Sequence, residues 1–476
     1  MRHPLRLLVA LALAVPAVGG DGPPSAAPSD ARPHDLPSVE RPALGGTLRS
    51  LYGREVRRLT DHKKQGVAYV QAEYATQNHV NADGTLIKLQ FPDGTVHLLR
   101  RETGEWLKPT LLTAQAPVWH PTDPGLLLYV DAEGKRVRVR RFDVTTGKSD
   151  TEYETADYVA FDSTGESDIS PDGKKLVFMA TTKAGGKRVL VYHREPSRLS
   201  ASTLEATGAH INWVQVSNSR VLVGYDLHPD SCAPDVPEAE RFYEADAGGR
   251  KKLVGCQPLR VYDTEMRPAW PGGRTLLASY WGHGDVGQDA TDGGREVWVM
   301  ANASAPVPRA DWFPGARPPG PPDCESSIVR FALDRPGEPT CLKTGHPGLP
   351  WDLALHVALP AQPAEFAYVS TYRTQGDTQY KPRVATPGAA PGPGSTIPFQ
   401  NEILRVRLDG RGCERLTHHH SSRHLAGPST YNWQPRASVD GRSRFVLFNS
   451  NFGDGDSNLD SDVYLVELGP AGPLSH

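Results

Sequence analysis

Short runs of hydrophobic residues follow tight polar turns throughout the chain. The stretch SDISPDGKKLVFMA, residues 167–180, has an apolar entry, a Pro-Asp-Gly turn and an apolar run, which predicts two antiparallel strands joined at the turn. Similar stretches begin at Asn81, His120, Ser217, Trp270, Leu359 and Ser438. Recurrence of one unit along the chain indicates a repeat architecture rather than a single hairpin.

A second hairpin follows several of these units, as in RVRVRRFDVTTGKS and KRVLVYHREP. Four short antiparallel strands per unit, in seven units, predict an all-β, seven-bladed β-propeller. The segment REVRRLT, residues 54–60, is predicted to pair with DVYLVEL, residues 462–468, so that the N-terminal strand closes the last blade and removes an open edge. The propeller is predicted to be a single domain over residues 51–470. A pair of β-sandwiches is the alternative.

The N-terminus has the layout of a secretory signal peptide. Arg2 and Arg6 precede the apolar run LLVALALAVPAV, which gives way to small and polar residues. This run is too short for a transmembrane helix, so no membrane insertion is expected. We predict a signal peptide over residues 1–20, a disordered leader over 21–50, and a periplasmic or extracellular location after cleavage.

Composition limits the partners and the redox chemistry. The chain has 52 basic and 55 acidic residues, so a nucleic-acid partner is not expected. Export permits disulfides, and the simplest local pairing joins Cys232 with Cys256 and Cys324 with Cys341, leaving Cys413. Other pairings remain open. The absence of a CxxC motif argues against a thiolate zinc site.

Two levels of similarity to known propellers are visible. The pattern SPDGKKLVF resembles the repeat of TolB-type propellers. The stretches LTDHKKQGVAYVQAEYATQNHVNADGTLIKL and QPRASVDGRSRFVLFNSNFG resemble parts of the oligogalacturonate lyase family. That resemblance implies a seven-bladed propeller with a divalent metal, held by histidines and a glutamine, that eliminates across a uronic acid residue. Where the family has metal-binding histidines, this chain has Asn432 and Gln434, which are weak ligands.

The first strand of each blade lines the channel of a propeller, so residues just ahead of the turns are predicted to converge there. Such a funnel could bind an anionic ligand, with an arginine on its carboxylate and a histidine as base. The alternative is that these side chains satisfy one another and hold channel water. The predicted catalytic residues are His79, His356, Arg267 and Arg436, and the predicted binding residues are Asp168, Asn212, Gln215 and Gln434.

The stretch SYWGHGDVGQDATDGGREVW, residues 279–298, departs most from the repeat. It contains Tyr280, Trp281 and His283, which could stack on a sugar ring and bond its hydroxyls. The alternative is a hairpin with aromatic packing.

Two segments carry candidate metal ligands. The run RLTHHHSSRHLAG contains four histidines, of which at most two could share an ion, and a solvated loop is the favoured interpretation. The segment FGDGDSNLDSD offers oxygen donors suited to calcium, or forms a solvated acidic turn. These donors are Asp454, Asp456, Asn458, Asp460 and Asp462.

The sequence leaves two functional classes open. The first is an exported binding or interaction module whose polar central funnel recognises a glycan or protein partner. The second is an oligogalacturonate-type polysaccharide lyase, with calcium or manganese as its divalent metal and metal-assisted β-elimination as its reaction. The altered metal positions favour the first class, and whether the chain is an enzyme at all stays open.

Overall fold

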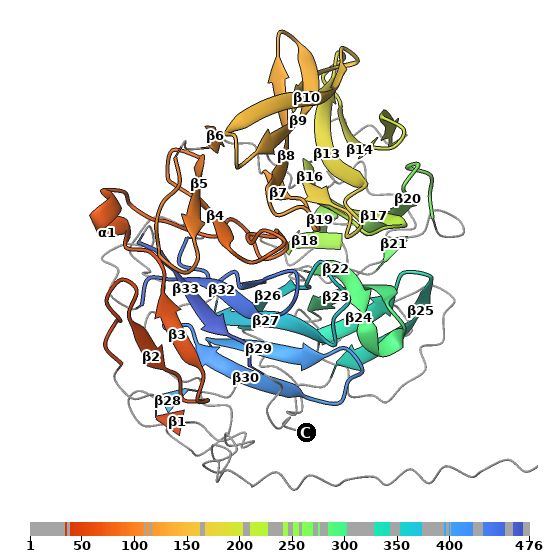
Figure 1. Cartoon of the computed structure of the whole chain (residues 1–476). Coiled ribbons are helices and arrows are strands. Elements are labelled where there is room, and N and C mark those ends of the chain that lie inside the picture. The colour runs from red at the N-terminus through yellow and green to blue at the C-terminus, as the bar shows by residue number, and fades with distance from the viewer. Residues whose placement is uncertain are drawn as a thin grey trace, which may run out of the picture.

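The computed structural model is composed almost entirely of antiparallel β-sheet (Figure 1). Helix in the described part is limited to His62–Gln65 (α1) and the 3-10 turn Ala290–Asp292 (η4), and neither could cross a membrane. The structure describes residues 34–35, 39–108, 111–113, 117–161, 167–202, 210–226, 241–245, 251–256, 259–269, 275–276, 284–301, 328–342, 353–373, 395–396, 399, 401–421, 432–452 and 460–469.

The first three sheets are formed by strands that follow one another in the chain. Their orders are β4-β5-β6, β10-β9-β8-β7 and β11-β13-β14-β15, with β12 also paired to β13. The strands are Leu86–Gln90 (β4), Thr95–Arg100 (β5), Leu111–Thr113 (β6), Val118–Trp119 (β7), Leu126–Glu133 (β8), Arg136–Asp143 (β9), Lys148–Thr155 (β10), Tyr158–Phe161 (β11), Asp168–Ile169 (β12), Lys175–Thr182 (β13), Lys187–His193 (β14) and Arg198–Ala201 (β15).

The next three sheets have the orders β16-β17-β20-β21, β22-β23-β24-β25 and β26-β27-β29-β30, with the hairpin β18-β19 inserted after β17. The strands are His210–Val216 (β16), Arg220–Asp226 (β17), Arg241–Ala245 (β18), Lys251–Cys256 (β19), Leu259–Asp263 (β20), Thr275–Leu276 (β21), Asp285–Asp289 (β22), Arg295–Ala301 (β23), Ile328–Ala332 (β24), Arg335–Leu342 (β25), Leu353–Ala358 (β26), Phe366–Arg373 (β27), Glu402–Arg407 (β29) and Cys413–His418 (β30).

One further sheet joins the two ends of the chain in the order β2-β3-β33-β32-β31. Its register places Val56 opposite Val466 and Arg58 opposite Tyr464. A short pair, β1 with β28, lies apart from it. The strands are His34–Asp35 (β1), Thr47–Arg49 (β2), Glu55–Arg58 (β3), Ser395–Thr396 (β28), Ser438–Val439 (β31), Phe445–Ser450 (β32) and Asp462–Glu467 (β33).

The repeated turn has a common physical basis. The side chain at its first position accepts a backbone hydrogen bond from the strand that follows: Asn81 Oδ1 from Leu86 N at 2.9 Å, and Asp440 Oδ1 from Phe445 N at 3.1 Å. Ser170 Oγ does the same for Lys175 N at 3.0 Å. Gly173 in this last turn has a φ of +72°, and a Cβ there would lie 2.4 Å from His120. These local bonds explain why the turns were predictable from the sequence.

The innermost strands of neighbouring sheets contact one another in series: β7 with β12, β12 with β16, β16 with β22, β22 with β26, and β26 with β31. Figure 1 shows β4, β7, β16, β22 and β26 near the middle of the molecule, with later strands further out. The core is divided into layers between adjacent sheets. One layer contains Val297 and Val369, and another contains Ile87 and Leu447.

Carboxylates on the innermost strands tie one sheet to the next. Asp168 accepts hydrogen bonds from Ile169 N and, in the next sheet, from Val216 N, both at 2.8 Å. Asp285 holds an equivalent position and accepts from Leu359 N at 2.6 Å. These bonds fix the spacing of the sheets.

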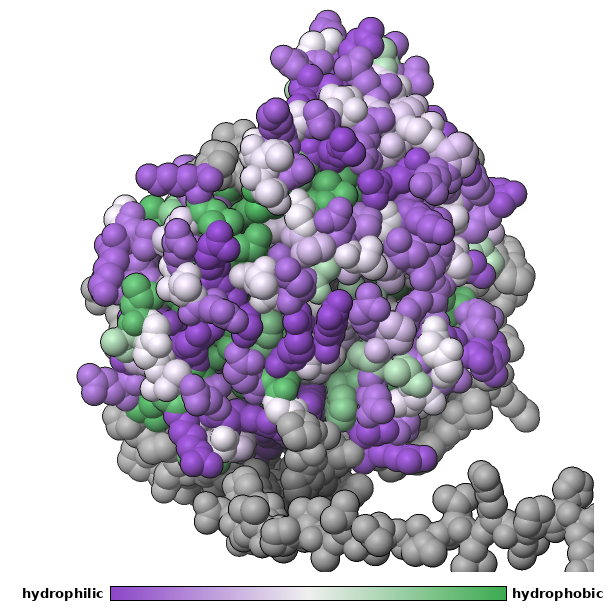
Figure 2. Space-filling model, viewed as in Figure 1, coloured by the Kyte–Doolittle hydropathy of each residue, from purple (hydrophilic) through white to green (hydrophobic). Residues whose placement is uncertain are grey.

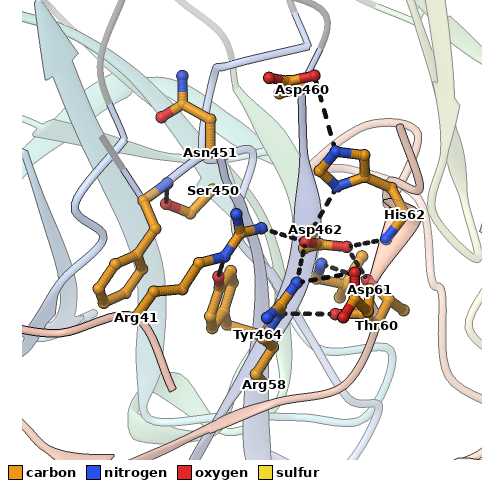
Figure 3. A network of polar contacts seen from close by, with 12 residues as sticks. Arg41, Arg58, Thr60, Asp61, His62, Ser450, Asn451, Asp460, Asp462 and Tyr464 are labelled. Carbon is orange, nitrogen blue, oxygen red and sulfur yellow. Dashed lines mark hydrogen bonds and ion pairs between the residues drawn. The ribbon is translucent and has the colours of Figure 1, made fainter. Parts of the chain in front are cut away.

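The two chain ends are joined by a closure network around Asp462, composed of Arg41, Arg58, Thr60, His62 and Asp462 (Figure 3). Arg58 Nη2 donates to Asp462 Oδ2 at 2.8 Å, Thr60 Oγ1 donates to Oδ1 at 3.0 Å, and Arg41 also pairs with the carboxylate. Burial opposes ionisation of Asp462, but the hydrogen bond with His62 and the charges of Arg58 and Arg41 outweigh it and lower its pKa.

Two boundaries differ from the sequence-based expectations. The leader was predicted to be disordered to residue 50, yet Arg41 belongs to the closure network and β2 pairs with β3.

The unit predicted to begin at Trp270 was also misplaced. It contains β21, the outermost strand of its sheet, and the next sheet begins at β22. A turn followed by apolar residues also occurs between outer strands, so the pattern did not distinguish them.

The closure network predicts a large loss of stability on substitution of Asp462. In D462N, Arg58 and Arg41 lose the carboxylate that compensates their charges, so we expect the free energy of unfolding to fall by about 3–5 kcal/mol. Urea unfolding of the full chain measures this loss. The matched control is D334N, because Asp334 forms an exposed ion pair with Arg295, and its loss should stay below about 1 kcal/mol. Equal losses in the two variants would contradict the assignment.

Candidate functional site

Three of the four predicted catalytic residues converge on Tyr74. His79 Nε2 is 2.8 Å from the Tyr74 carbonyl oxygen, and the His356 ring meets the Tyr74 ring edge-on at a centroid distance of 5.3 Å. The Arg436 guanidinium lies 5.8 Å from the centre of the Tyr74 ring and donates to the Glu73 carbonyl at 2.6 Å. These side chains come from three different sheets.

Six residues form a group that we call the Tyr74 cluster. The segment before β4 supplies Tyr74 and His79, β26 supplies His356, and Arg436 precedes β31. Local pairing positions His79, because Val80 bridges Ile87 and the His79 carbonyl accepts from Lys88 N at 2.8 Å. Trp119, from the next sheet, donates its Nε1–H to the same His79 carbonyl oxygen at 3.1 Å. The members of the cluster are Glu73, Tyr74, His79, Lys88, His356 and Arg436.

The two histidines contact Tyr74 and are shielded from solvent. His79 is 0% exposed and His356 is 1% exposed. Burial, reinforced by the charge of Lys88, holds the pKa of His79 well below its usual value, so this imidazole is neutral at neutral pH. The His356 ring stacks on Tyr372 at 5.0 Å. Neither ring reaches a ligand in this arrangement.

A buried ion pair holds the segment that carries Tyr74. Lys88 is 0% exposed, and its Nζ lies 2.8 Å from Glu73 Oε2 and 3.2 Å from Gln77 Oε1. An ammonium in the interior requires such partners. The pair therefore fixes Glu73, whose carbonyl receives the Arg436 guanidinium.

Glu73, Tyr74 and Arg436 are the partly exposed members of the cluster. Arg436 has a φ of 40°, in the left-handed region that non-glycine residues seldom occupy. Strain of this kind concentrates at functional sites. An aromatic face beside a guanidinium suits the binding of a ring-shaped ligand that carries an anionic group. We call this surface the Tyr74 mouth.

Arg267 does not join the cluster, so its predicted role in the funnel is wrong. Its side chain is 73% exposed and pairs with Asp263 at 2.8 Å, Nε to Oδ2, on the turn after β20. The error follows from the misplaced unit at Trp270.

Asp168 and Gln215, predicted to bind a ligand, instead bond neighbouring strands: Gln215 Nε2 donates to the Gly284 carbonyl at 2.9 Å. These two residues therefore match the alternative expectation, in which the polar side chains form hydrogen bonds within the protein. Gln434 is buried. The backbone of Asn212 belongs to β16, while its side chain lies outside the described residues.

Several predictions fall outside the described part of the chain. They concern Tyr280, Trp281, His283, His424, Asp454, Asp456, Asn458, Cys232, Cys324 and the side chain of Cys256. The disulfide pairings stay predictions, while Cys413 is a buried thiol.

The described donors do not fit the metal that the family resemblance implies. The oxygens of Asp462 are engaged by the closure network, which makes its predicted role as a calcium ligand wrong. His418 faces Glu402 at 3.2 Å, and His419 Nε2 bonds the Thr371 carbonyl at 2.9 Å. Asp460 lies 3.7 Å from His62. Within the described ranges, no three His, Cys, Asp or Glu side chains are grouped to hold an ion.

Sequence reasoning missed Tyr74, Glu73 and Lys88. One signal was available, since Lys88 is a charged residue inside the apolar strand LIKLQ. Its partners could not be inferred, because they depend on how the preceding segment folds over β4.

Comparison with solved structures supports the propeller fold. An oligogalacturonate lyase from Vibrio parahaemolyticus is similar at a TM-score of 0.50 and 12% sequence identity, over 89% of this chain and 96% of that chain. An oligogalacturonate lyase in complex with manganese has a TM-score of 0.49 and 14% identity, over 90% and 97% of the two chains. TolB from Acinetobacter baumannii has a TM-score of 0.26 and 15% identity, over 63% and 60%.

No protein-family model and no curated protein matches the chain. The structural likeness therefore defines a class of fold. The chain is a β-propeller similar in fold to an oligogalacturonate lyase, and a propeller fold is what its repeat predicted.

The carboxyl group of Asp168 predicts a pH-dependent stability. Burial raises the pKa of Asp168 from 3.8 to about 7, against the effect of its two backbone donors. The native state therefore binds a proton more tightly than the unfolded state, and the stabilisation is lost as the pH rises from 3.8 to about 7.

Urea unfolding across this pH range tests the assignment. The stability of the wild type relative to D168N should fall with rising pH, by at most about 1.4 kcal/mol per pH unit. Other carboxylates contribute equally to both proteins and cancel in the difference. Parallel stability curves for wild type and D168N would refute the shift.

Proposed function

We propose that this chain is an exported, seven-bladed β-propeller that binds an acidic glycan at the Tyr74 mouth. The observation that carries this proposal is the convergence of Tyr74 and Arg436, from the first and last sheets, on one partly exposed surface. Tyr74 offers an aromatic face to a sugar ring, and Arg436 offers donors to a carboxylate. The signal-like N-terminus supports the proposed export to the periplasm or the exterior.

The proposed closed ring is supported by contacts around the molecule. Seven sheets have three or more strands among the described residues, and we assign each to one blade. Asn449 exchanges two hydrogen bonds with the backbone of Ala72, at 2.8 and 2.9 Å, which joins the last sheet to the first. The pairing of β3 with β33 would complete the last blade.

Binding is favoured over elimination by the placement of the histidines. A general base must come within hydrogen-bond reach of the proton it removes. His79 and His356 are buried, and the ring of His79 is directed to the Tyr74 carbonyl. Both residues therefore support Tyr74 in this proposal. A protein partner is the other binding class, and it is distinguished by the experiment below.

Calorimetric titration with oligogalacturonate tests the mouth. R436A should weaken binding by at least about tenfold, because a charge-assisted hydrogen bond is removed. R267A is the matched control, since it removes an exposed arginine outside the cluster, and its affinity should equal that of the wild type. A neutral oligosaccharide of the same length should bind weakly to all three proteins.

Unchanged affinity in R436A would refute the role of this residue. Absence of any oligosaccharide binding would refute the glycan assignment and leave a protein partner. An increase in ultraviolet absorbance from an unsaturated uronate would instead establish the lyase reaction.

A further inference from the structure

A serine and a histidine meet at the outer edge of the third sheet, where β15 is the last strand. The register places His193 of β14 opposite Arg198 of β15, and Ser200 lies two positions further along β15, on the same face of the sheet. Diagonal neighbours of this kind are within reach of each other's side chains. Ser200 Oγ lies 3.1 Å from His193 Nε2, which is a hydrogen-bond distance.

The next sheet contributes a carboxylate to the same place. The turn that follows β20 carries Glu265, whose Oε2 lies 3.1 Å from Ser200 Oγ. Arg198 Nη1 donates to Ser200 Oγ at 2.9 Å and to Glu265 Oε2 at 2.8 Å. The Glu265 amide donates to Asp263 Oδ1 at 2.9 Å, which fixes the turn that carries the carboxylate. We call His193, Arg198, Ser200 and Glu265 the Ser200 group.

His193 is the group member that can accept the serine proton. Burial lowers the pKa of His193, and the charges of Arg198 and Lys175 add to this shift. Glu265 and a hydrogen bond with the Thr264 backbone oppose the shift without cancelling it, so the imidazole is neutral at neutral pH. The hydrogen bond from Arg198 lowers the pKa of Glu265 to about 2, which makes this carboxylate a weak base.

The Ser200 group reaches solvent through its charged members. Ser200 and His193 are buried, whereas the side chains of Arg198 and Glu265 are 41% and 38% exposed. Figure 2 shows mainly hydrophilic surface over the part of the molecule where Figure 1 labels β14 and β20. Polar surroundings of this kind suit a small, water-soluble substrate better than a lipid.

We propose that Ser200 is a nucleophile that His193 activates, and that it accepts acyl groups from small, water-soluble carboxylic esters. A serine hydroxyl becomes a good nucleophile when an adjacent base takes its proton, and the two side chains are at the distance that this transfer needs. The Arg198 guanidinium donates to Ser200 Oγ, so it is placed to stabilise negative charge that develops on oxygen there. This inference is independent of ligand binding at the Tyr74 mouth.

The proposed acyl transfer uses no group beyond the ester and water. Ser200 Oγ attacks the carbonyl carbon of the ester while its proton passes to His193 Nε2, and the carbonyl electron pair moves to oxygen, beside Arg198. When that pair returns, the bond to the leaving alcohol breaks, and the alcohol takes the proton from His193. Water then attacks the acyl-serine in the same way, which releases the carboxylic acid and restores the hydroxyl.

Labelling of the full chain with a fluorophosphonate, which phosphonylates nucleophilic serines with loss of fluoride, tests the proposal. Tandem mass spectrometry of the wild type should locate the adduct on Ser200. In H193Q, the labelling rate should fall about a hundredfold or more, because glutamine cannot take the proton. S197A is the matched control, since Ser197 is exposed and lies 3.1 Å from the Tyr192 hydroxyl, and it should be labelled at the wild-type rate.

The pH dependence of labelling separates a base-activated serine from an ordinary hydroxyl. With His193 as the base, the rate should vary little above about pH 7 and should decline at lower pH as the imidazole becomes protonated. An ordinary hydroxyl would instead react faster throughout as the hydroxide concentration rises.

Three results would each overturn the proposal: no adduct on Ser200 in the wild type, equal labelling rates in the wild type and H193Q, or a rate that rises steadily with pH. Circular dichroism and melting temperature establish that H193Q and S197A are folded. The location of the adduct and the pH profile are measured on the wild type, so they decide the proposal even if a variant does not fold.

Discussion

The joining of the N-terminal and C-terminal segments depends on one buried carboxylate. Asp462 receives Arg58, Thr60 and the backbone of His62, and it also pairs with Arg41, a residue 421 positions away in the chain. Bringing such distant segments together costs loop entropy, which increases slowly with length, so a few strong contacts can hold the ends. A buried carboxylate without these partners would oppose folding. The same group therefore stabilises the joined segments and penalises partial assembly.

The candidate site depends on this joining because its parts come from segments far apart in the chain. Tyr74 lies in the segment before β4 and Lys88 lies in β4, while Arg436 lies just before β31. Asn449 bonds the backbone of Ala72, only two positions from Tyr74, so the joined ends and the mouth share one rigid neighbourhood. The geometry of recognition is consequently a property of the assembled molecule and of no single sheet.

Local chemistry was readable in the sequence, whereas long-range pairing was not. The turns at Asn81, Ser170 and Asp440 were predictable because their side chains bond backbone groups a few residues away. His79, His356 and Arg436 were predicted from their positions ahead of such turns, although the burial of both histidines was not. Arg267 was misassigned because an outer-strand turn has the same composition as an inner one. Asp462 was predicted to be a calcium ligand because the sequence around it gives no sign of its ion pair with the distant Arg41.

The burial of His79 and His356 favours a supporting role for these residues over general-base catalysis. A histidine held neutral in the interior, with one ring nitrogen directed to a carbonyl, supports a neighbouring side chain more readily than it exchanges protons with a ligand. Tyr74 is that neighbour: its carbonyl contacts His79, its ring contacts His356, and the same ring lies beside Arg436. A surface built in this way is fixed in shape before a ligand arrives, which lowers the entropic cost of binding. Support of a partly exposed aromatic residue and a guanidinium by buried neighbours is therefore the physical basis for the proposal that this surface recognises a ligand.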